Sequence, residues 1–130
     1  MEFKNINNLI NQRKFSEAKE IIIKFLEKNE KSSLETPKIS KEYYARIYFI
    51  LSQICIQLNE LVDAKNYLLK HLQTNTKDLE AILLLANLQL KTRDIEEAEE
   101  NYKKILKMND KYLPAITNLA FLYEGVGKIN

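Results

Sequence analysis

The fold of this chain is decided by residues 79–112, which read LEAILLLANLQLKTRDIEEAEENYKKILKMNDKY. The first part of this stretch follows the i, i+3, i+4, i+7 spacing of one helix face. The residues at that spacing are Ile82, Leu85, Ala86 and Gln89. After a break at Thr92-Arg93-Asp94 the helical spacing resumes, at Ile95, Ala98, Tyr102, Ile105 and Leu106. The stretch therefore predicts a helix, a tight turn and a second, antiparallel helix.

The second helix of this stretch begins with the residues that favour a helix N-terminus. Asp94 directly precedes the apolar pattern, and its side-chain oxygen is expected to cap the helix. Glu96 and Glu97 follow in the first turn, where the helix dipole favours acidic side chains. We therefore expect the helix to start at Asp94.

The same pattern recurs every 34 residues along most of the chain. A large residue, a leucine and a small residue occupy corresponding positions, which are Tyr48, Leu51 and Ser52; Ile82, Leu85 and Ala86; and Ile116, Leu119 and Ala120. Ala64 and Ala98 correspond in the second helices, and small residues of this kind let two helices cross closely. A repeat of this length predicts a stack of helix pairs, because no single pair can bury its own apolar face.

The N-terminal region shows the pattern at a step of 46 residues. Its core positions correspond to later ones as Phe15, Ala18, Ile22, Phe25 and Leu26 to Leu61, Ala64, Leu68, His71 and Leu72. Since 46 − 34 = 12, extra residues separate the first two pairs, and loop-type residues place this insertion at about 29–41. The expected units are about 2–28, 45–78, 79–112 and a truncated 113–130. We expect about seven helices in a single domain over 1–130, as a fragment of a longer protein.

Composition argues against several classes of protein. The formal net charge of +2 lacks the basic excess of most nucleic-acid binders. There is no run of about 18 apolar residues, and residues 1–12 lack the apolar core of a signal peptide. Cys55 is the only cysteine, which is compatible with a reducing compartment. We expect a cytoplasmic protein that binds neither nucleic acid nor membranes.

The sequence offers no set of residues for catalysis, a metal or a cofactor. His71 is the only histidine and lies on an apolar helix face, so we expect it to pack in the core. Cys55 lies on the buried stripe and is expected to be inert. The acidic cluster Glu96–Glu100 lies on a solvated helix face, where Glu99 pairs with Lys103. We therefore expect no enzyme activity, no metal and no cofactor.

On these residues the chain resembles the tetratricopeptide repeat (TPR) family. The large–Leu–small series of the first helix and the alanine of the second match the family's unit over residues 45–130, and more loosely over 1–44. The matching alanines are Ala18, Ala64 and Ala98. The departures are the absence of Trp, His71 in place of a small residue and Asp110 in place of a proline. The resemblance implies an all-α fold, a right-handed α-solenoid of antiparallel helix pairs.

The resemblance also implies a concave groove along the first helices, where such arrays bind peptides or partner proteins. Projecting the helix pattern onto this face gives a partner-binding set of Arg46, Phe49, Ile50, Gln53, Leu83, Leu84, Asn87, Lys91, Thr117, Asn118 and Phe121. Some family members grip a C-terminal carboxylate with Lys, Asn and Arg, but the corresponding positions here are Phe49, Gln53, Leu84, Pro114 and Asn118. We therefore expect a protein or peptide ligand that is apolar or amphipathic.

Several alternatives remain open at this point. The groove residues could simply pack between neighbouring first helices, or the array could recruit substrates for a catalytic module outside this sequence. RNA binding by related helical repeats is opposed by the 34-residue step, the net charge and the apolar groove. Ile116, Leu119 and Tyr123 are expected to face a helix that this sequence does not contain, so self-association through them is possible.

Overall fold

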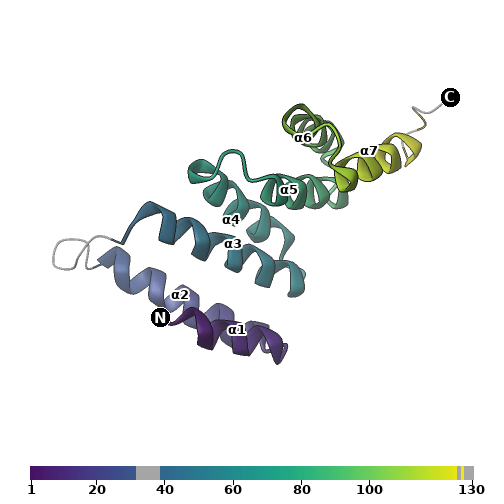
Figure 1. The fold of residues 1–130 in the computed structure, drawn as a ribbon. Helices are drawn as coiled ribbons and strands as arrows, with labels where there is room; N and C mark the ends of the chain where they lie inside the picture. The colour runs from purple at the N-terminus through teal and green to yellow at the C-terminus, as the bar shows by residue number, and fades with distance from the viewer. Residues whose placement is uncertain (32–38, 126, 128–130) are drawn as a thin grey trace. The chain divides into compact units, whose positions relative to one another are not determined.

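The computed structural model describes residues 1–31, 39–125 and 127, and these residues form seven α-helices and no strands (Figure 1). The helices are α1 (Phe3–Asn11), α2 (Phe15–Lys31), α3 (Lys41–Gln57), α4 (Leu61–Thr74), α5 (Leu79–Lys91), α6 (Ile95–Met108) and α7 (Leu113–Gly125). Successive helices pack as pairs, α1 with α2, α3 with α4 and α5 with α6, and α7 packs on α6 and α5. The predicted all-α helical repeat fold is confirmed.

The helices fall into two compact units, which are described separately. Unit 1 comprises residues Met1–Thr74 with α1 to α4, and unit 2 comprises Asn75–Asn130 with α5 to α7. Long helices form because the chain has only two glycines and two prolines to interrupt them. Pro114 stands in the first turn of α7, where its missing N–H leaves no helical hydrogen bond unmade.

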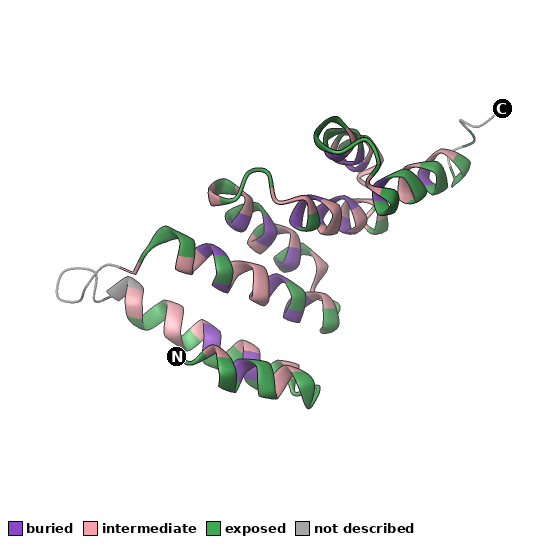
Figure 2. Cartoon of the chain, in the orientation of Figure 1, coloured by how far each residue is buried: buried purple, intermediate pink, exposed green. Residues whose placement is uncertain are grey.

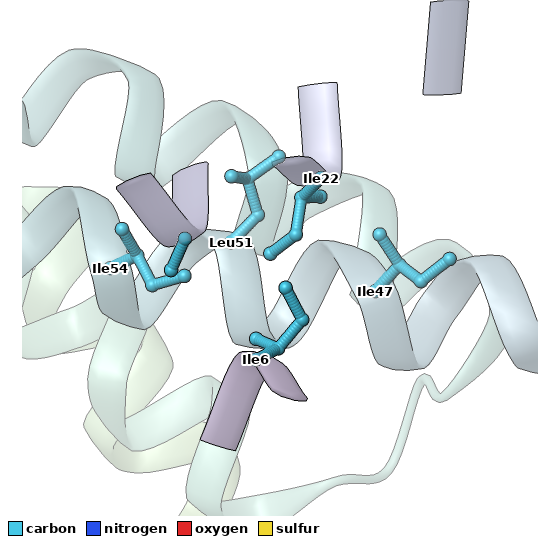
Figure 3. Packing of buried hydrophobic residues seen from close by; sticks show 6 residues of the cluster. Ile6, Ile22, Ile47, Leu51 and Ile54 are labelled. Carbon is cyan, nitrogen blue, oxygen red and sulfur yellow. The ribbon is translucent and has the colours of Figure 1, made fainter. Parts of the chain in front are cut away.

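The core of unit 1 joins three helices through branched aliphatic side chains. It consists of Ile6 from α1, Ala18 and Ile22 from α2, and Ile47, Leu51 and Ile54 from α3. Figure 3 shows the labelled isoleucines and Leu51 converging on one another, and none is more than 1% exposed. Because this cluster includes Ile6 of α1, the first helix is an integral part of unit 1.

The small residues predicted at the helix crossings are buried wherever a second helix covers them. Ala18, Ala64 and Ala98 on the second helices are each 0% exposed. On the first helices Ser52 and Ala86 are also 0% exposed, and the Ser52 hydroxyl donates to the Phe49 carbonyl at 2.6 Å. Ala120 holds the corresponding position in α7 but is exposed.

The turn that follows each first helix has one residue in the left-handed conformation, and these residues recur at the spacing of the repeats. They are Arg13 (φ 58°), Asn59 (φ 60°), Arg93 (φ 69°) and Gly127 (φ 69°). After α5 the N–H of Arg93 donates to the Leu90 carbonyl at 3.2 Å, and the N–H of Asp94 donates to the Gln89 carbonyl at 2.8 Å. These two bonds form a Schellman motif, which satisfies carbonyls that the end of α5 would otherwise leave unpaired.

Replacing Arg93 by glycine should stabilise unit 2 by about 0.5–1 kcal/mol. A side chain with a Cβ disfavours the left-handed conformation, and this gain exceeds the added entropy of glycine in the unfolded chain. Arg93→Val should have the opposite effect, because a β-branched side chain fits this conformation worst. Urea unfolding monitored by circular dichroism measures both variants. Identical midpoints for the two would show that the turn does not carry this strain.

Two of the helices, α3 and α5, begin at a residue whose side chain caps the helix. The Ser40 side chain accepts from the N–H of Tyr43 at 3.2 Å, and the Asp78 side chain accepts from the N–H of Ala81 at 3.3 Å. The cap predicted at Asp94 is wrong, because Asp94 lies at the N-cap of α6 but its side chain makes no capping hydrogen bond. The tight turn holds Asp94 at ψ 68° instead of the 152° of Ser40, and its carboxylate accepts from the Thr92 hydroxyl at 3.0 Å. The first turn of α6 nevertheless contains the predicted Glu96 and Glu97.

The predicted insertion at about 29–41 coincides with the end of α2 and the start of α3. Helix α2 runs to Lys31, so the first residues of this segment are helical. Helix α3 begins at Lys41, ahead of the boundary expected at residue 45. Residues 32–38, the centre of the predicted insertion, lie outside the described residues.

Candidate functional site

The residues predicted to bind a partner lie on first helices, four of them on α3 of unit 1. These four, called here the inner face of unit 1, are Arg46, Phe49, Ile50 and Gln53. The guanidinium carbon of Arg46 lies 4.1 Å from the ring centroid of Phe3 on α1. The Phe49 ring lies 4.9 Å from the His71 ring on α4, centroid to centroid. Both side chains therefore contact neighbouring helices, and Arg46 remains exposed.

The other two residues of this face differ in what they contact. Ile50 is half-buried and packs against the core of unit 1. Gln53 is exposed and lies beside a pocket of about 490 Å³. The pocket is lined by Ile10, Asn11, Arg13, Phe15, Gln53, Ile54 and Gln57. It combines two isoleucines and a phenylalanine with three amides and one guanidinium, a mixture typical of sites that hold part of a ligand.

Of the seven residues that line this pocket, only Gln53 belongs to the partner-binding set predicted from the sequence. Arg13 occupies the left-handed turn after α1, and its guanidinium carbon lies 5.6 Å from the ring centroid of Phe15. This cation–π contact keeps Arg13 close to the apolar side chain of Phe15. The 46-residue step relates Arg13 to Asn59 in the turn after α3, and this relation could have marked Arg13 as a turn residue beside α3.

The remaining predicted residues form the inner face of unit 2, and two of them join its three helices. The inner face of unit 2 consists of Leu83, Leu84, Asn87, Lys91, Thr117, Asn118 and Phe121. Asn87 Oδ1 on α5 accepts from the Tyr102 hydroxyl on α6 at 2.5 Å and from Asn118 Nδ2 on α7 at 2.9 Å. One amide oxygen therefore bonds to both other helices. Asn87 and Asn118 thus link the helices of unit 2. Asn87 Oδ1 and the Asn118 Nδ2 hydrogen that it accepts are therefore not available to a ligand.

Away from these two amides, the inner face of unit 2 is more accessible. Leu83 and Leu84 on α5 are half-buried, whereas Lys91 and Thr117 are exposed. Phe121 is 72% exposed and lies one turn beyond Asn118 on α7. The Asn118–Asn87 bond joins α7 to α5, and Phe121 lies on the same side of α7 as Asn118, because residues three apart are neighbours on a helix surface.

The single histidine and the single cysteine of the chain are both buried. His71 is 5% exposed, and its Nδ1 donates to the Ala45 carbonyl at 2.8 Å, so its predicted place in the core is confirmed. Cys55 is 0% exposed, and burial raises the pKa of its thiol to about 11. A thiol with such a pKa stays protonated at neutral pH and is a poor nucleophile. Burial likewise raises the pKa of Tyr102 to about 12, which keeps its hydroxyl a hydrogen-bond donor.

The described residues hold no cluster of three or more His, Cys, Asp or Glu side chains suited to a metal ion. None of the helices in residues 1–31 and 39–125 combines the length and the apolar character needed to cross a membrane. On α6 the ion pair between Glu99 and Lys103, with Oε1 and Nζ 3.2 Å apart, is confirmed as a surface contact. The exposed surfaces of the first helices are therefore the features that call for a functional explanation.

Comparison with known proteins identifies the repeat. Residues 79–112 match the family model described as tetratricopeptide repeat. No significant match to a curated protein sequence is found. The matched segment begins with α5 and includes all of α6, which is the helix pair from which the fold was predicted.

Solved structures of tetratricopeptide proteins share the fold of nearly the whole chain. The crystal structure of MamA is similar with a TM-score of 0.78 at 20% identity, covering 95% of this chain and 66% of MamA. The first TPR of Spaghetti (RPAP3), bound to the HSP90 peptide SRMEEVD, gives 0.75 at 14% identity over 95% of this chain and 89% of that one. The C-terminal TPR-containing domain of a Plasmodium falciparum protein described as FK506-binding gives 0.73 at 17% identity, over 96% and 85%. At these identities the likeness concerns the fold.

Proposed function

We propose that this chain, which has the tetratricopeptide repeat fold, is an interaction module that binds a segment of a partner protein on the inner faces of its first helices. The observation that carries the proposal is the exposed ring of Phe121 beside the Asn118–Asn87 bond, which joins α7 to α5 in unit 2. A large aromatic side chain left 72% exposed next to a rigid hydrogen-bonded support is typical of a binding surface. The similar RPAP3 domain, bound to a peptide, supports binding of the same kind.

The chemistry of the inner faces indicates what the partner segment should contain. The accessible groups of unit 2 are the ring of Phe121, the half-buried Leu83 and Leu84, the Thr117 hydroxyl and the Lys91 ammonium. An amphipathic segment would place apolar side chains against the ring and leucines. It would direct an acidic or amide side chain to Lys91. In unit 1 the pocket beside Gln53 would take a single apolar side chain flanked by polar groups.

Phe121→Asp should weaken partner binding by about 10- to 30-fold, because it replaces the largest exposed apolar side chain of the inner face with a charge. Affinity capture with the full chain first identifies proteins lost in the variant, and titration of the purified partner segment by isothermal calorimetry then measures the affinity. Val62→Asp is the matched control, since Val62 is 66% exposed on α4 and lies outside both inner faces. Both variants should keep the circular dichroism spectrum of the parent. Partners that bind Phe121→Asp as tightly as the parent would refute the proposal.

Two other functions would use the same surfaces. A substrate-recruiting accessory domain would bind its segment in the same way and would differ only in the enzyme that acts on it. RNA binding is less well supported, because Arg46 and Lys91 are the only cations among the predicted inner-face residues. We further propose that the chain has no catalytic role of its own, acts in the cytoplasm and forms one domain of a longer protein.

A further inference from the structure

The pocket beside Gln53 in unit 1 is lined by one cation and no anion. Arg13 is the only ionisable residue of the lining, and the other polar lining residues are three amides, Asn11, Gln53 and Gln57. All lining residues lie between positions 10 and 57, so neither end of the sequence contributes to the pocket. A carboxylate complements this lining, because it accepts hydrogen bonds from guanidinium and amide N–H groups, and its single charge matches the single guanidinium.

The polar side chains of this pocket are not engaged elsewhere in the described part of the chain. Among the residues that the structure describes, Arg13 forms no ion pair, and its guanidinium contacts the ring of Phe15. The side-chain amides of Asn11, Gln53 and Gln57 likewise form no hydrogen bond with any described residue. All four polar side chains are exposed, and Figure 2 shows exposed segments at the ends of α1 and α3. Their hydrogen-bonding groups are therefore available to a ligand.

The repeat explains why the amide of Gln53 is available. Gln53 corresponds to Asn87, thirty-four residues later, whose Oδ1 accepts from the Tyr102 hydroxyl at 2.5 Å. The residue that corresponds to Tyr102 in unit 1 is Leu68, which has no polar group in its side chain. Unit 1 therefore lacks the hydroxyl that engages the equivalent amide in unit 2.

The turn after α1 fixes the backbone of Arg13 beside the apolar part of the pocket. Arg13 has a left-handed backbone (φ 58°), and its N–H donates to the Ile10 carbonyl at 2.9 Å. Ile10 and Phe15, which lie on either side of this turn in the sequence, both line the pocket. The guanidinium therefore extends from a fixed turn, and the cation–π contact with Phe15 keeps it near an apolar wall.

We propose that this pocket binds the side-chain carboxylate of an aspartate or glutamate in an extended segment of the partner protein. An adjacent apolar side chain of the segment packs against Ile10, Phe15 and Ile54. The amides come from two helices and offer both donors and acceptors, so they match the backbone on both sides of the acidic residue. This proposal deepens the function proposed above and rests on it, because it assigns an acidic residue to the bound segment.

Two tetrapeptides, both acetylated and amidated, probe the pocket directly. They are Gly-Phe-Glu-Gly and its uncharged control Gly-Phe-Gln-Gly, and each is titrated into the isotope-labelled full chain. Nuclear magnetic resonance follows the backbone signal of Arg13 and the side-chain amide signals of Gln53 and Gln57. The glutamate peptide should shift these signals with a Kd on the order of 1 mM. The glutamine peptide should bind about threefold more weakly, because it cannot pair with the guanidinium.

Arg13→Asn removes the charge and keeps a residue suited to the turn, since this chain has Asn59 at the corresponding position after α3. It should weaken binding of the glutamate peptide about threefold and abolish its advantage over the glutamine peptide. Arg93→Asn is the matched control, because it makes the same change of charge at the same turn position in unit 2. Its affinity for the glutamate peptide should equal that of the parent.

Several results would overturn the proposal. These are equal affinity for the two peptides, equal losses in Arg13→Asn and Arg93→Asn, and no shift of the pocket signals at about 10 mM peptide. Acetylated Gly-Gly-Phe with a free C-terminus distinguishes a terminal carboxylate, and tighter binding of this peptide than of the glutamate peptide would contradict an internal acidic residue. Binding of the partner to Phe121→Asp is measured separately. A failure of the peptide experiment therefore removes the acidic residue from the partner segment and leaves the proposed interaction module standing.

Discussion

Ala86→Leu is expected to destabilise unit 2 by about 3 kcal/mol, with a decrease of Tm on the order of 10 °C. Ala86 of α5 and Ala98 of α6 are each 0% exposed, and the two helices pack against each other. A position as fully buried as Ala86 leaves no room for the three additional carbon atoms of a leucine. The helices must separate or the leucine must adopt an unfavourable rotamer, and either change loses packing along the whole pair.

Ala120→Leu is the matched control for this prediction. Ala120 lies thirty-four residues after Ala86 at the same position of the repeat, but it is exposed. The same substitution should therefore change the free energy of unfolding by no more than about 0.5 kcal/mol. Ala98→Leu should resemble Ala86→Leu, because Ala98 of α6 is also 0% exposed. Chemical unfolding of the purified chain tests all three, and a similar loss at Ala86 and Ala120 would show that burial at the crossing is not the cause.

The helical part of the fold could be predicted because the repeat encodes it several times over. Leu51, Leu85 and Leu119 recur at a step of 34 residues, and so do Ala64 and Ala98. Each unit thus supplies independent evidence for the same helix pair. The absence of a side-chain cap at Asp94 could not be predicted in this way. It depends on the geometry of the turn, in which the Asp94 carboxylate accepts from the Thr92 hydroxyl.

The exposure of the predicted groove residues could not be predicted from the sequence. Helical periodicity assigns Asn87, Phe49 and Phe121 to first helices, but it does not say how much of each side chain a neighbour occupies. Asn87 bonds to two helices and Phe49 packs on His71, whereas Phe121 remains 72% exposed. These differences arise from contacts between residues far apart in sequence. The pocket beside Gln53 was missed for the same reason, because α1, the turn after it, α2 and α3 all contribute to it.

Tyr102→Ala should cost about 3–5 kcal/mol, because it removes a large side chain that is 0% exposed in unit 2. Tyr102→Phe keeps the ring and removes only the hydroxyl, so it should cost about 1 kcal/mol. The difference between the two losses of stability measures what the packing of the Tyr102 ring contributes. Urea unfolding of both variants provides these values, and equal losses for the two would mean that the hydroxyl dominates.

The hydroxyl of Tyr102 has a further, local effect to test. It donates to Asn87 Oδ1, the same oxygen that accepts from Asn118 and so joins α7 to α5. In Tyr102→Phe this oxygen retains only one of these two bonds, so α7 should separate from the unit more often while α5 and α6 remain paired. Hydrogen–deuterium exchange should then be faster in Leu113–Gly125 and little changed in Leu79–Lys91. Faster exchange throughout unit 2 would instead mean that Tyr102 supports the whole unit, and the inner face would not depend on this bond in particular.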